Sequence, residues 1–430
     1  MLLAALVCAC HESTDSGVDG APVDSEEGPG DSDADTATDI GDLGKDTAAE
    51  AAEEAAYAAF YDVRVVQQVV LALSSADADA MDEEALREYT IHPSNPVLSY
   101  FPASITINGE TVNDVGLRLK GSSTFQFWEQ KPSLKVKFSE IDPEQRFAGL
   151  KRATFNNMTG DPAMSREVVG YHFWQEAGMA VPAANFAQLW VSFDGADPLY
   201  YGLYTNLEAM DSEWVERNFD DDGGDLWEGN DSADFSRSGI DHFALVTGLG
   251  DKDLLDIARD QVQNHGDDFY TEVNDVLDMD NFLDFWTLSL TIGNRDGYPF
   301  HLNDYFVYLD PGDGRFDFIP WGMDESFDTA TPTYANYVTG AVAANCLYYD
   351  ATCPQRYLDA MEQNLDLYEA SDIATFAGAM QDLSVDAMTD DTRKNWAGYA
   401  LTTAQVETYR TTLNYRIEMY PGWLRETMGL

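Results

Sequence analysis

The stretch TIGNRDGYPFHLNDYFVY, residues 291–308, carries more polar side chains than a connection between two elements needs. Asp296 and Asn303 lie in this loop, and the strand that follows turns at PGDG into a second strand that leads to Asp324. A hairpin whose two ends present Asn303 and Asp324 brings amide and carboxylate oxygens together beside Asp296. Such oxygens are hard ligands of the kind that suit Mg²⁺.

The order of these elements is as informative as the residues. A helix, a loop with an Asp, a strand, a turn, a strand and another Asp resemble the catalytic half of a protein kinase, in which one Asp faces the substrate hydroxyl and later oxygens hold Mg²⁺. Taken one at a time, Asp296 has an ordinary alternative as a residue that ends a helix, and Asp324 as a turn acid. The ordered set favours phosphoryl transfer.

Alternating sequence patterns predict the strands that must position this chemistry. The dipeptide NG separates predicted strands near Ser104–Ile107 and Val112–Lys120, and a third strand, Pro132–Phe138, places Ser133 and Lys135 on one face. Further predicted elements are a helix over 165–178, strands over 184–195 and 200–211, helices over 252–277 and 279–292, the latter capped by Asp278, strands over 304–310 and 315–321, and helices from about 357 onward. We therefore expect an α+β fold in which a small antiparallel sheet precedes a mainly helical part.

Several stretches, taken in chain order, resemble the CotH kinase family, named for spore coat protein H. They include VGLRLKGSST with KPSLKVKF, YYGLYTNLEAMDSEWVERNF, GNRDGYPFHLNDYFVY and FDFIPWGMDESF, and the resemblance runs from about Tyr57 to Phe327. It implies an atypical protein-kinase-like fold with two lobes: an antiparallel sheet N-lobe over 57–210 and a mainly helical C-lobe over 211–430.

The resemblance assigns roles around the polar loop. Asp296 matches the catalytic Asp, while Asn303 and Asp324 match metal-binding residues. Two features depart from the family pattern. Gly322 stands where the family usually has the first Asp of PWDxD, which removes one potential ligand, and Asn303 lies seven residues after Asp296 rather than the five of ordinary kinases.

The same resemblance implies residues that bind ATP. Arg118, Lys131 and Lys135 lie in the stretch that contacts nucleotide phosphates, with Lys131 the first choice. The segment TNLEAMD, which contains Glu208, resembles the hinge that borders adenine. An alternative role for Lys131 is to neutralise Glu129.

The sequence leaves the roles of two further groups of charged residues open. Arg166 and Glu167 in the predicted helix are either a surface pair or the partners of a phosphate-binding Lys. The acidic run FDDDGGD, residues 219–225, faintly resembles a Ca²⁺ loop but lacks the closing Glu, so a solvated turn is the simpler interpretation.

The N-terminal residues indicate export. MLLAALVCAC is an apolar run too short to span a bilayer, and its end resembles a lipobox in which Cys10 would be lipidated, although a basic n-region is missing. Residues 1–10 are therefore expected to be a lipoprotein-type signal segment. Residues 11–56 are acidic with almost no large apolar side chain, which predicts a disordered linker. Cys346 and Cys353 lie seven positions apart and could form a small disulfide in an oxidising compartment.

The net charge and the absence of certain motifs argue against several classes of partner and enzyme. The formal net charge of -53 argues against nucleic acid or an anionic membrane as a partner of the bulk surface. The sequence contains no GxSxG elbow or Walker loop and no paired His spacing typical of metallohydrolases. Two functions remain: an exported or surface-tethered kinase that uses ATP and Mg²⁺ to phosphorylate Ser, Thr or Tyr of an extracytoplasmic protein, or a pseudokinase that acts as a surface scaffold.

Overall fold

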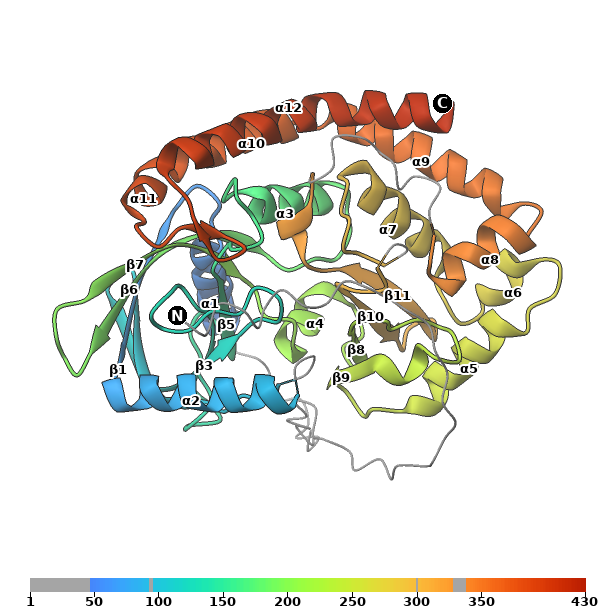
Figure 1. Cartoon of the computed structure of the whole chain (residues 1–430). Coiled ribbons are helices and arrows are strands. Elements are labelled where there is room, and N and C mark those ends of the chain that lie inside the picture. Colours follow the sequence, from blue (N-terminus) through green and yellow to red (C-terminus); the bar gives the residue numbers. More distant parts are fainter. Residues whose placement is uncertain (1–46, 93–95, 299–300, 328–337) are drawn as a thin grey trace. The chain divides into compact units, whose positions relative to one another are not determined.

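The computed structural model describes residues 47–92, 96–298, 301–327 and 338–430 (Figure 1). Cys10, the predicted signal segment and the linker up to residue 46 lie outside this part of the chain. Helix α1, Thr47–Phe60, corrects the expected end of the linker, because residues 47–56 are helical rather than disordered. Their alanine-rich sequence has a high intrinsic helix propensity, and Phe60 is buried in the core that the helix approaches.

The first sheet is a closed barrel of seven strands, in the order β1-β2-β3-β4-β5-β7-β6. The strands are β1 (Gln67–Leu73), β2 (Phe101–Ile107), β3 (Glu110–Lys120), β4 (Ser133–Lys137), β5 (Arg152–Asn156), β6 (Ala184–Phe193) and β7 (Leu199–Leu207). Neighbouring strands are antiparallel except β1 and β6, whose parallel pairing closes the barrel. The sequence predicted a small antiparallel sheet and did not predict its closure.

Strand alternation separates the barrel interior from its outer face. Leu117 and Leu119 of β3 and Leu134 and Val136 of β4 are buried in one apolar cluster. The residues between them point to the other face, since successive side chains on a strand alternate. Helix α2 (Ser75–Ile91) packs against β2 and β3.

A second sheet of four strands has the order β11-β10-β8-β9. Its strands are β8 (Leu226–Gly229), β9 (Phe243–Thr247), β10 (Tyr305–Asp310) and β11 (Arg315–Pro320). Strands β10 and β11 form the predicted hairpin, in which Tyr305 pairs with Pro320 and Asp310 with Arg315. The ends of this hairpin therefore bring Asp304 and Trp321 together, and Trp321 N donates to Asp304 O at 3.1 Å.

Helices cover the two sheets. Helix α3 (Arg166–Glu176) packs against β6 and against the 3₁₀ turn η2 (Met323–Glu325) that follows the hairpin. Helix α7 (Met279–Thr291) begins at Asp278, whose side chain accepts from the backbone N–H groups of Asp280 and Asn281, as the sequence predicted. The helix predicted over 252–277 is instead two helices, α5 (Lys252–Gln263) and α6 (Phe269–Val273), interrupted around Gly266.

The remaining elements are short or belong to the C-terminal part. They are α4 (Ser212–Asn218), η1 (Ile240–His242), α8 (Ala341–Tyr349), α9 (Cys353–Ala370), α10 (Ile373–Leu383), α11 (Val385–Asp390), β12 (Asn395–Trp396), β13 (Tyr399–Ala400) and α12 (Thr403–Met428). The long helix α12 packs against α10, α9 and α7 (Figure 1). Among the described residues, no helix is both long enough and apolar enough to cross a bilayer.

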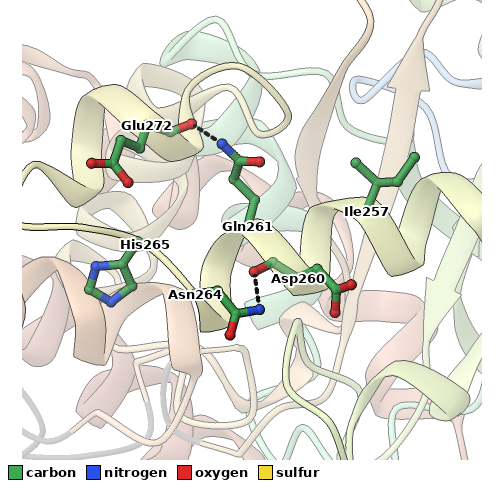
Figure 2. Close-up of a pocket in the computed structure, with 6 residues that line it drawn as sticks. All are labelled: Ile257, Asp260, Gln261, Asn264, His265 and Glu272. Atoms are coloured by element: carbon green, nitrogen blue, oxygen red, sulfur yellow. Dashed lines mark hydrogen bonds between the residues drawn. The ribbon is translucent and has the colours of Figure 1, made fainter.

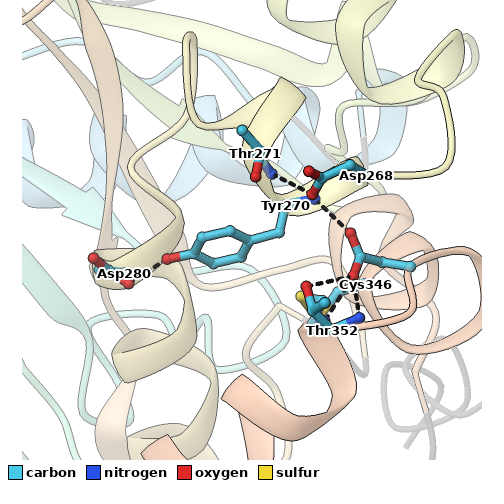
Figure 3. Close-up of a disulfide and its surroundings, with 8 residues drawn as sticks. Asp268, Tyr270, Thr271, Asp280, Cys346 and Thr352 are labelled. Carbon is cyan, nitrogen blue, oxygen red and sulfur yellow. Dashed lines mark hydrogen bonds between the residues drawn. A yellow bond between two sulfur atoms is a disulfide. The ribbon is translucent and has the colours of Figure 1, made fainter.

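A disulfide joins Cys346 of α8 to Cys353 of α9, the pairing expected from the sequence, and both residues are fully buried (Figure 3). Between them Asp350 accepts from Thr352 N at 2.6 Å and from Tyr270 N at 2.9 Å. The bridge therefore fixes a turn that also anchors α6.

The fold is α+β, as the sequence predicted. The structure shows that the N-terminal sheet closes into a seven-stranded barrel, and it adds a second sheet to the part that was expected to be mainly helical. The likeness of this arrangement to the two lobes of a kinase stays a prediction.

Candidate functional site

A cavity of about 620 Å³ is lined by residues of both sheets, and its volume is in the range of small-molecule sites. Five of the predicted site residues line it: Arg118, Lys135, Asp296, Asn303 and Asp324. Arg118 and Lys135 lie far in the sequence from Asp296, Asn303 and Asp324, so the tertiary fold brings together two groups of residues that were assigned to one site.

Cations line the barrel side of the cavity. Arg118 and Lys120 alternate along β3, and Lys135 on β4 is the register partner of Arg118. The strand period of two places all three on the outer face of the barrel. The hydroxylic loop residues Ser122–Thr124 follow directly and also line the cavity. Lysine, arginine and hydroxyl groups at one wall are suited to binding phosphate oxygens.

Lys120 is tied to helix α3 through Asn156. Its Nζ donates to Asn156 Oδ1 at 2.6 Å, and Asn156 Nδ2 donates to Glu167 Oε1 at 2.7 Å. Burial lowers the pKa of Lys120, while the charges of Glu167 and Asp324 oppose that effect. Of the two possibilities left open for Glu167, the structure therefore supports a link to a cavity lysine rather than a surface pair.

Carboxylates line the same cavity. They belong to Glu167, Glu228, Asp231, Asp296, Asp304, Asp324 and Glu325. Burial, followed by the negative charges of Asp296 and Asp324, raises the pKa of Asp304 well above its ordinary value. Burial, followed by Glu167 and Glu325, raises the pKa of Asp324 to about 7. Acids gathered in this way stay ionised only when a cation offsets their repulsion.

Asp324 lies directly against the backbone of a glycine. A Cβ atom built on Gly160 would overlap Asp324 Oδ2 and lie 3.1 Å from its Cγ. Gly160 belongs to the segment NNMTGD between β5 and α3, which lines the same cavity. The absence of a side chain at position 160 therefore leaves the space that the Asp324 carboxylate occupies.

Asp296 lies in the loop that follows α7. Its side chain is about one-third exposed, and its Oδ1 lies 3.9 Å from His301 Nδ1. The neighbouring residue Arg295 donates from Nε to Glu325 Oε2 at 3.0 Å, which ties the loop to η2. Asp296 is thus open to the cavity, where a substrate hydroxyl could reach it.

Lys131, the first choice for phosphate binding, does not line the cavity. It is 0% exposed, and its Nζ donates to Asp391 Oδ2 and to Leu203 O, each at 2.7 Å. The proposed pairing with Glu129 is also absent from the described ion pairs of Lys131. This correction has a plain cause: Lys131 lies just before β4 begins and points to the C-terminal segment, whereas Lys120 ends β3 inside the cavity.

Glu208 is also outside the cavity. It is 1% exposed, it is paired with Arg217, and its Oε2 accepts from Tyr57 Oη and from Ala183 N, each at 2.9 Å. These bonds occupy its carboxylate in holding α1 and α4 to the barrel. The structure therefore assigns Glu208 a structural role and gives no support to its expected place beside adenine.

Two charged residues that matter for the cavity, Lys120 and Asp304, were not among the site residues predicted from the sequence. Lys120 follows Arg118 at strand spacing, so the alternation that selected Arg118 was a signal for it as well. Asp304 directly follows Asn303, but nothing local distinguishes it from a strand-initiating acid.

The donor set fits a magnesium ion bound together with phosphate. Asp324 and Asp304 offer carboxylate oxygens, Asn303 offers an amide oxygen, and the space at Gly160 and Gly322 accommodates the two carboxylates. In the described part of the chain, the group His172, Glu176 and Asp372 alone brings three such ligand atoms within 4.8 Å of one another. No three acids of the cavity come that close in the described residues, and Mg²⁺ in proteins usually takes one or two carboxylates beside waters and phosphate oxygens.

A second cavity, of about 360 Å³, lies along α5 and contains none of the predicted site residues (Figure 2). Its polar side chains are engaged with backbone groups: Gln261 donates to Glu272 O and Asn264 to Asp260 O, both at 2.9 Å. Because no Lys or Arg lines it, unlike the larger cavity, we assign the chemistry to the latter.

Comparisons with known proteins show the family of the chain. The sequence model of the family described as CotH kinase protein matches residues 117–415. Inner spore coat protein H of Bacillus subtilis (strain 168) is 24% identical over 246 residues, which are 53% of this chain and 62% of that protein. The chain thus spans less than two thirds of this curated relative. Because the family match covers more than half of the chain and includes the cavity from Arg118 to Asp324, the protein belongs to the CotH kinase protein family.

Proposed function

We propose that the protein is a Mg²⁺-dependent kinase that transfers the γ-phosphoryl group of ATP to a hydroxyl group of a protein. The observation that carries this proposal is that Arg118, Lys120 and Lys135 line one cavity together with Asp296 and Asp324. Such a site suits a ligand that is itself an anion carrying a divalent cation, which is the form of Mg²⁺-bound ATP.

In the proposed reaction, the acceptor oxygen bonds to the γ-phosphorus while the bond between that phosphorus and the bridging oxygen of ADP breaks. Asp296 orients the acceptor hydroxyl and accepts its proton. Lys120 and Arg118 offset phosphate charge. Asp324 and Asn303 would hold Mg²⁺, which supplies electrostatic stabilisation to the phosphates when it is bound. Glu167 positions Lys120 through Asn156.

Titration with ATP and labelled-phosphate transfer test this function. Asp296→Asn should abolish transfer and leave ATP binding largely intact, because the residue meets the acceptor. Asp324→Asn should weaken ATP binding only when Mg²⁺ is present. Asp197→Asn, at an exposed turn acid outside the cavity, is the matched control. An Asp296→Asn protein that transfers phosphate to itself or to a mixed protein substrate at the wild-type rate would refute the assignment.

The alternative function is a pseudokinase scaffold, and the observation that favours it is Gly322 in place of an acid. Thermal stabilisation by ATP with and without Mg²⁺ separates the two functions, because a ligand stabilises only a protein that binds it. A wild-type melting temperature that does not respond to ATP under either condition would favour the scaffold.

We further propose that the protein acts outside the cytoplasm, tethered through lipidated Cys10 or secreted, on a Ser, Thr or Tyr of an extracytoplasmic protein. The buried Cys346–Cys353 disulfide supports an oxidising compartment, and the acidic linker supports a tether. A Cys10→Ala chain should move from the membrane fraction to the medium. Equal membrane retention would count against the lipid anchor.

A further inference from the structure

Gly322 and Asp304 share one space at the end of the β10–β11 hairpin. A Cβ atom built on Gly322 would overlap the Oδ2 and Cγ atoms of Asp304 and lie 2.9 Å from its Cβ. The carboxylate of Asp304 thus stands where the first atoms of a side chain at position 322 would begin. Gly322 itself has a φ of 64°, a conformation that favours glycine but that Asp and Asn also adopt.

The Asp304 carboxylate faces the cavity without a partner of its own. Asp304 lines the cavity with Asn303 and Asp324. Among the described residues, none donates a hydrogen bond to its side chain and none forms an ion pair with it. Its strongest electrostatic neighbours are other acids, Asp296 first and Asp324 second. A partly buried carboxylate placed among carboxylates is unfavourable unless a bound cation is part of its function.

We propose that Asp304 supplies the metal-binding carboxylate that Gly322 lacks, so that Asp304 and Asp324 together hold the phosphate-bound Mg²⁺. This inference rests on the proposed function, and it removes the observation that favoured a pseudokinase. Asp304 stands at one end of the hairpin and Gly322 at the other, and the bare glycine leaves room for the Asp304 carboxylate. Trp321 N, bonded to Asp304 O, holds the two ends of the hairpin together.

Isothermal titration with ATP, with and without Mg²⁺, tests the role of Asp304. Asp304→Asn keeps the shape of the side chain and removes its charge. We expect it to lower the affinity for ATP at least tenfold in the presence of Mg²⁺ and to leave the Mg²⁺-free affinity unchanged. The melting temperature of the unliganded variant should be equal to or above that of the wild type, because repulsion is relieved. Asp197→Asn should match the wild type in every measurement.

A transposition provides the sharper test. Asp304→Gly should lose the Mg²⁺ effect, and the double variant Asp304→Gly with Gly322→Asp should regain most of it, because the carboxylate returns to the same space from the other strand. Mn²⁺ bound in the presence of ATP, counted by its paramagnetic resonance signal, gives a readout independent of transfer.

The two proposals fail in different ways. If Asp304→Asn binds ATP and Mg²⁺ as the wild type does, Asp304 is not a ligand, while the proposed kinase function stands. If the transposed variant folds but does not regain Mn²⁺ binding over Asp304→Gly, the shared space has no metal-binding role. A wild-type protein whose affinity for ATP is the same with and without Mg²⁺ would overturn both the inference and the proposed function.

Discussion

Lys131 Nζ donates a hydrogen bond to Asp391 Oδ2 at 2.7 Å, and both side chains are almost completely buried. Asp391 follows α11, and the same oxygen accepts from Leu203 N on β7 at 3.1 Å. A Cβ atom on Gly202 would overlap the Asp391 carboxylate, so the acid lies directly against the strand. This ion pair joins the C-terminal segment to the barrel.

Removing one member of this pair should destabilise the fold strongly. Asp391→Ala leaves a buried ammonium without its counter-charge, and we expect a loss of about 3–5 kcal/mol in the free energy of unfolding. Denaturant unfolding measures it. Arg64→Ala, which breaks an exposed pair with Asp62, should have little effect. A small loss for Asp391→Ala would mean that water or another group satisfies Lys131.

Lys120 rather than Lys131 should be needed for phosphoryl transfer. Lys120→Met keeps an apolar stem of similar length but removes the charge on the cavity wall, and we expect the transfer rate to fall roughly 10²-fold or more. Lys137→Met, on the same outer strand face but outside the cavity, is the matched control. The transfer of radiolabelled phosphate at saturating ATP measures the rates of both variants. A Lys120→Met rate equal to that of the wild type would exclude Lys120 from the mechanism.

Gly160→Ala should impair the metal site while the protein still folds. The new methyl group would displace the Asp324 carboxylate, so Mg²⁺-dependent ATP affinity should fall, with overpacking costing about 1–3 kcal/mol of stability. Gly378→Ala in α10, where the Cβ meets nothing within 4 Å, should be neutral or stabilise by about 0.5–1 kcal/mol. Unchanged Mg²⁺ dependence in the Gly160 variant would show that Asp324 is free to move.

Stability should depend on pH through Asp317. Burial, followed by the charges of Asp278 and Asp313, raises the pKa of Asp317 to about 7. Because the folded state then binds a proton that the unfolded state has lost, this contribution is present at low pH and is lost as the pH rises through about 7.

Asp317→Asn should therefore raise stability above pH 7, by about 1 kcal/mol after allowance for solvent screening, and change it little near pH 4. Melting temperatures measured from pH 4 to 8 check this contribution. A difference in melting temperature between the variant and the wild type that stays constant from pH 4 to 8 would contradict this prediction.

Reduction of the Cys346–Cys353 disulfide should lower the free energy of unfolding of the C-terminal part. The sequence separation of seven residues closes a short loop, for which the chain-entropy estimate is about 2–3 kcal/mol. The double variant Cys346→Ala with Cys353→Ala should unfold at lower denaturant concentration, and dithiothreitol should then have no further effect. Equal midpoints for the wild type with and without reductant would contradict this expectation.

The sequence by itself determined the local elements and much of the chemistry. Strand alternation placed Lys135 on the face that meets the cavity, and the cap at Asp278 fixed the start of α7, because both patterns depend on neighbours a few residues apart. The helix, loop and hairpin that carry Asp296, Asn303 and Asp324 were predicted for the same reason. These three residues do line one cavity.

Only the tertiary structure decided between chemically equivalent residues. Lys120 and Lys131 have the same side chain and flank the same loop, yet one faces the carboxylates and the other is buried against Asp391. Asp304 became a candidate ligand because Gly322 has no Cβ to fill the space that its carboxylate occupies. Such choices depend on which distant segments share a volume, and that information is absent from any short stretch of sequence because close packing couples residues across the whole fold.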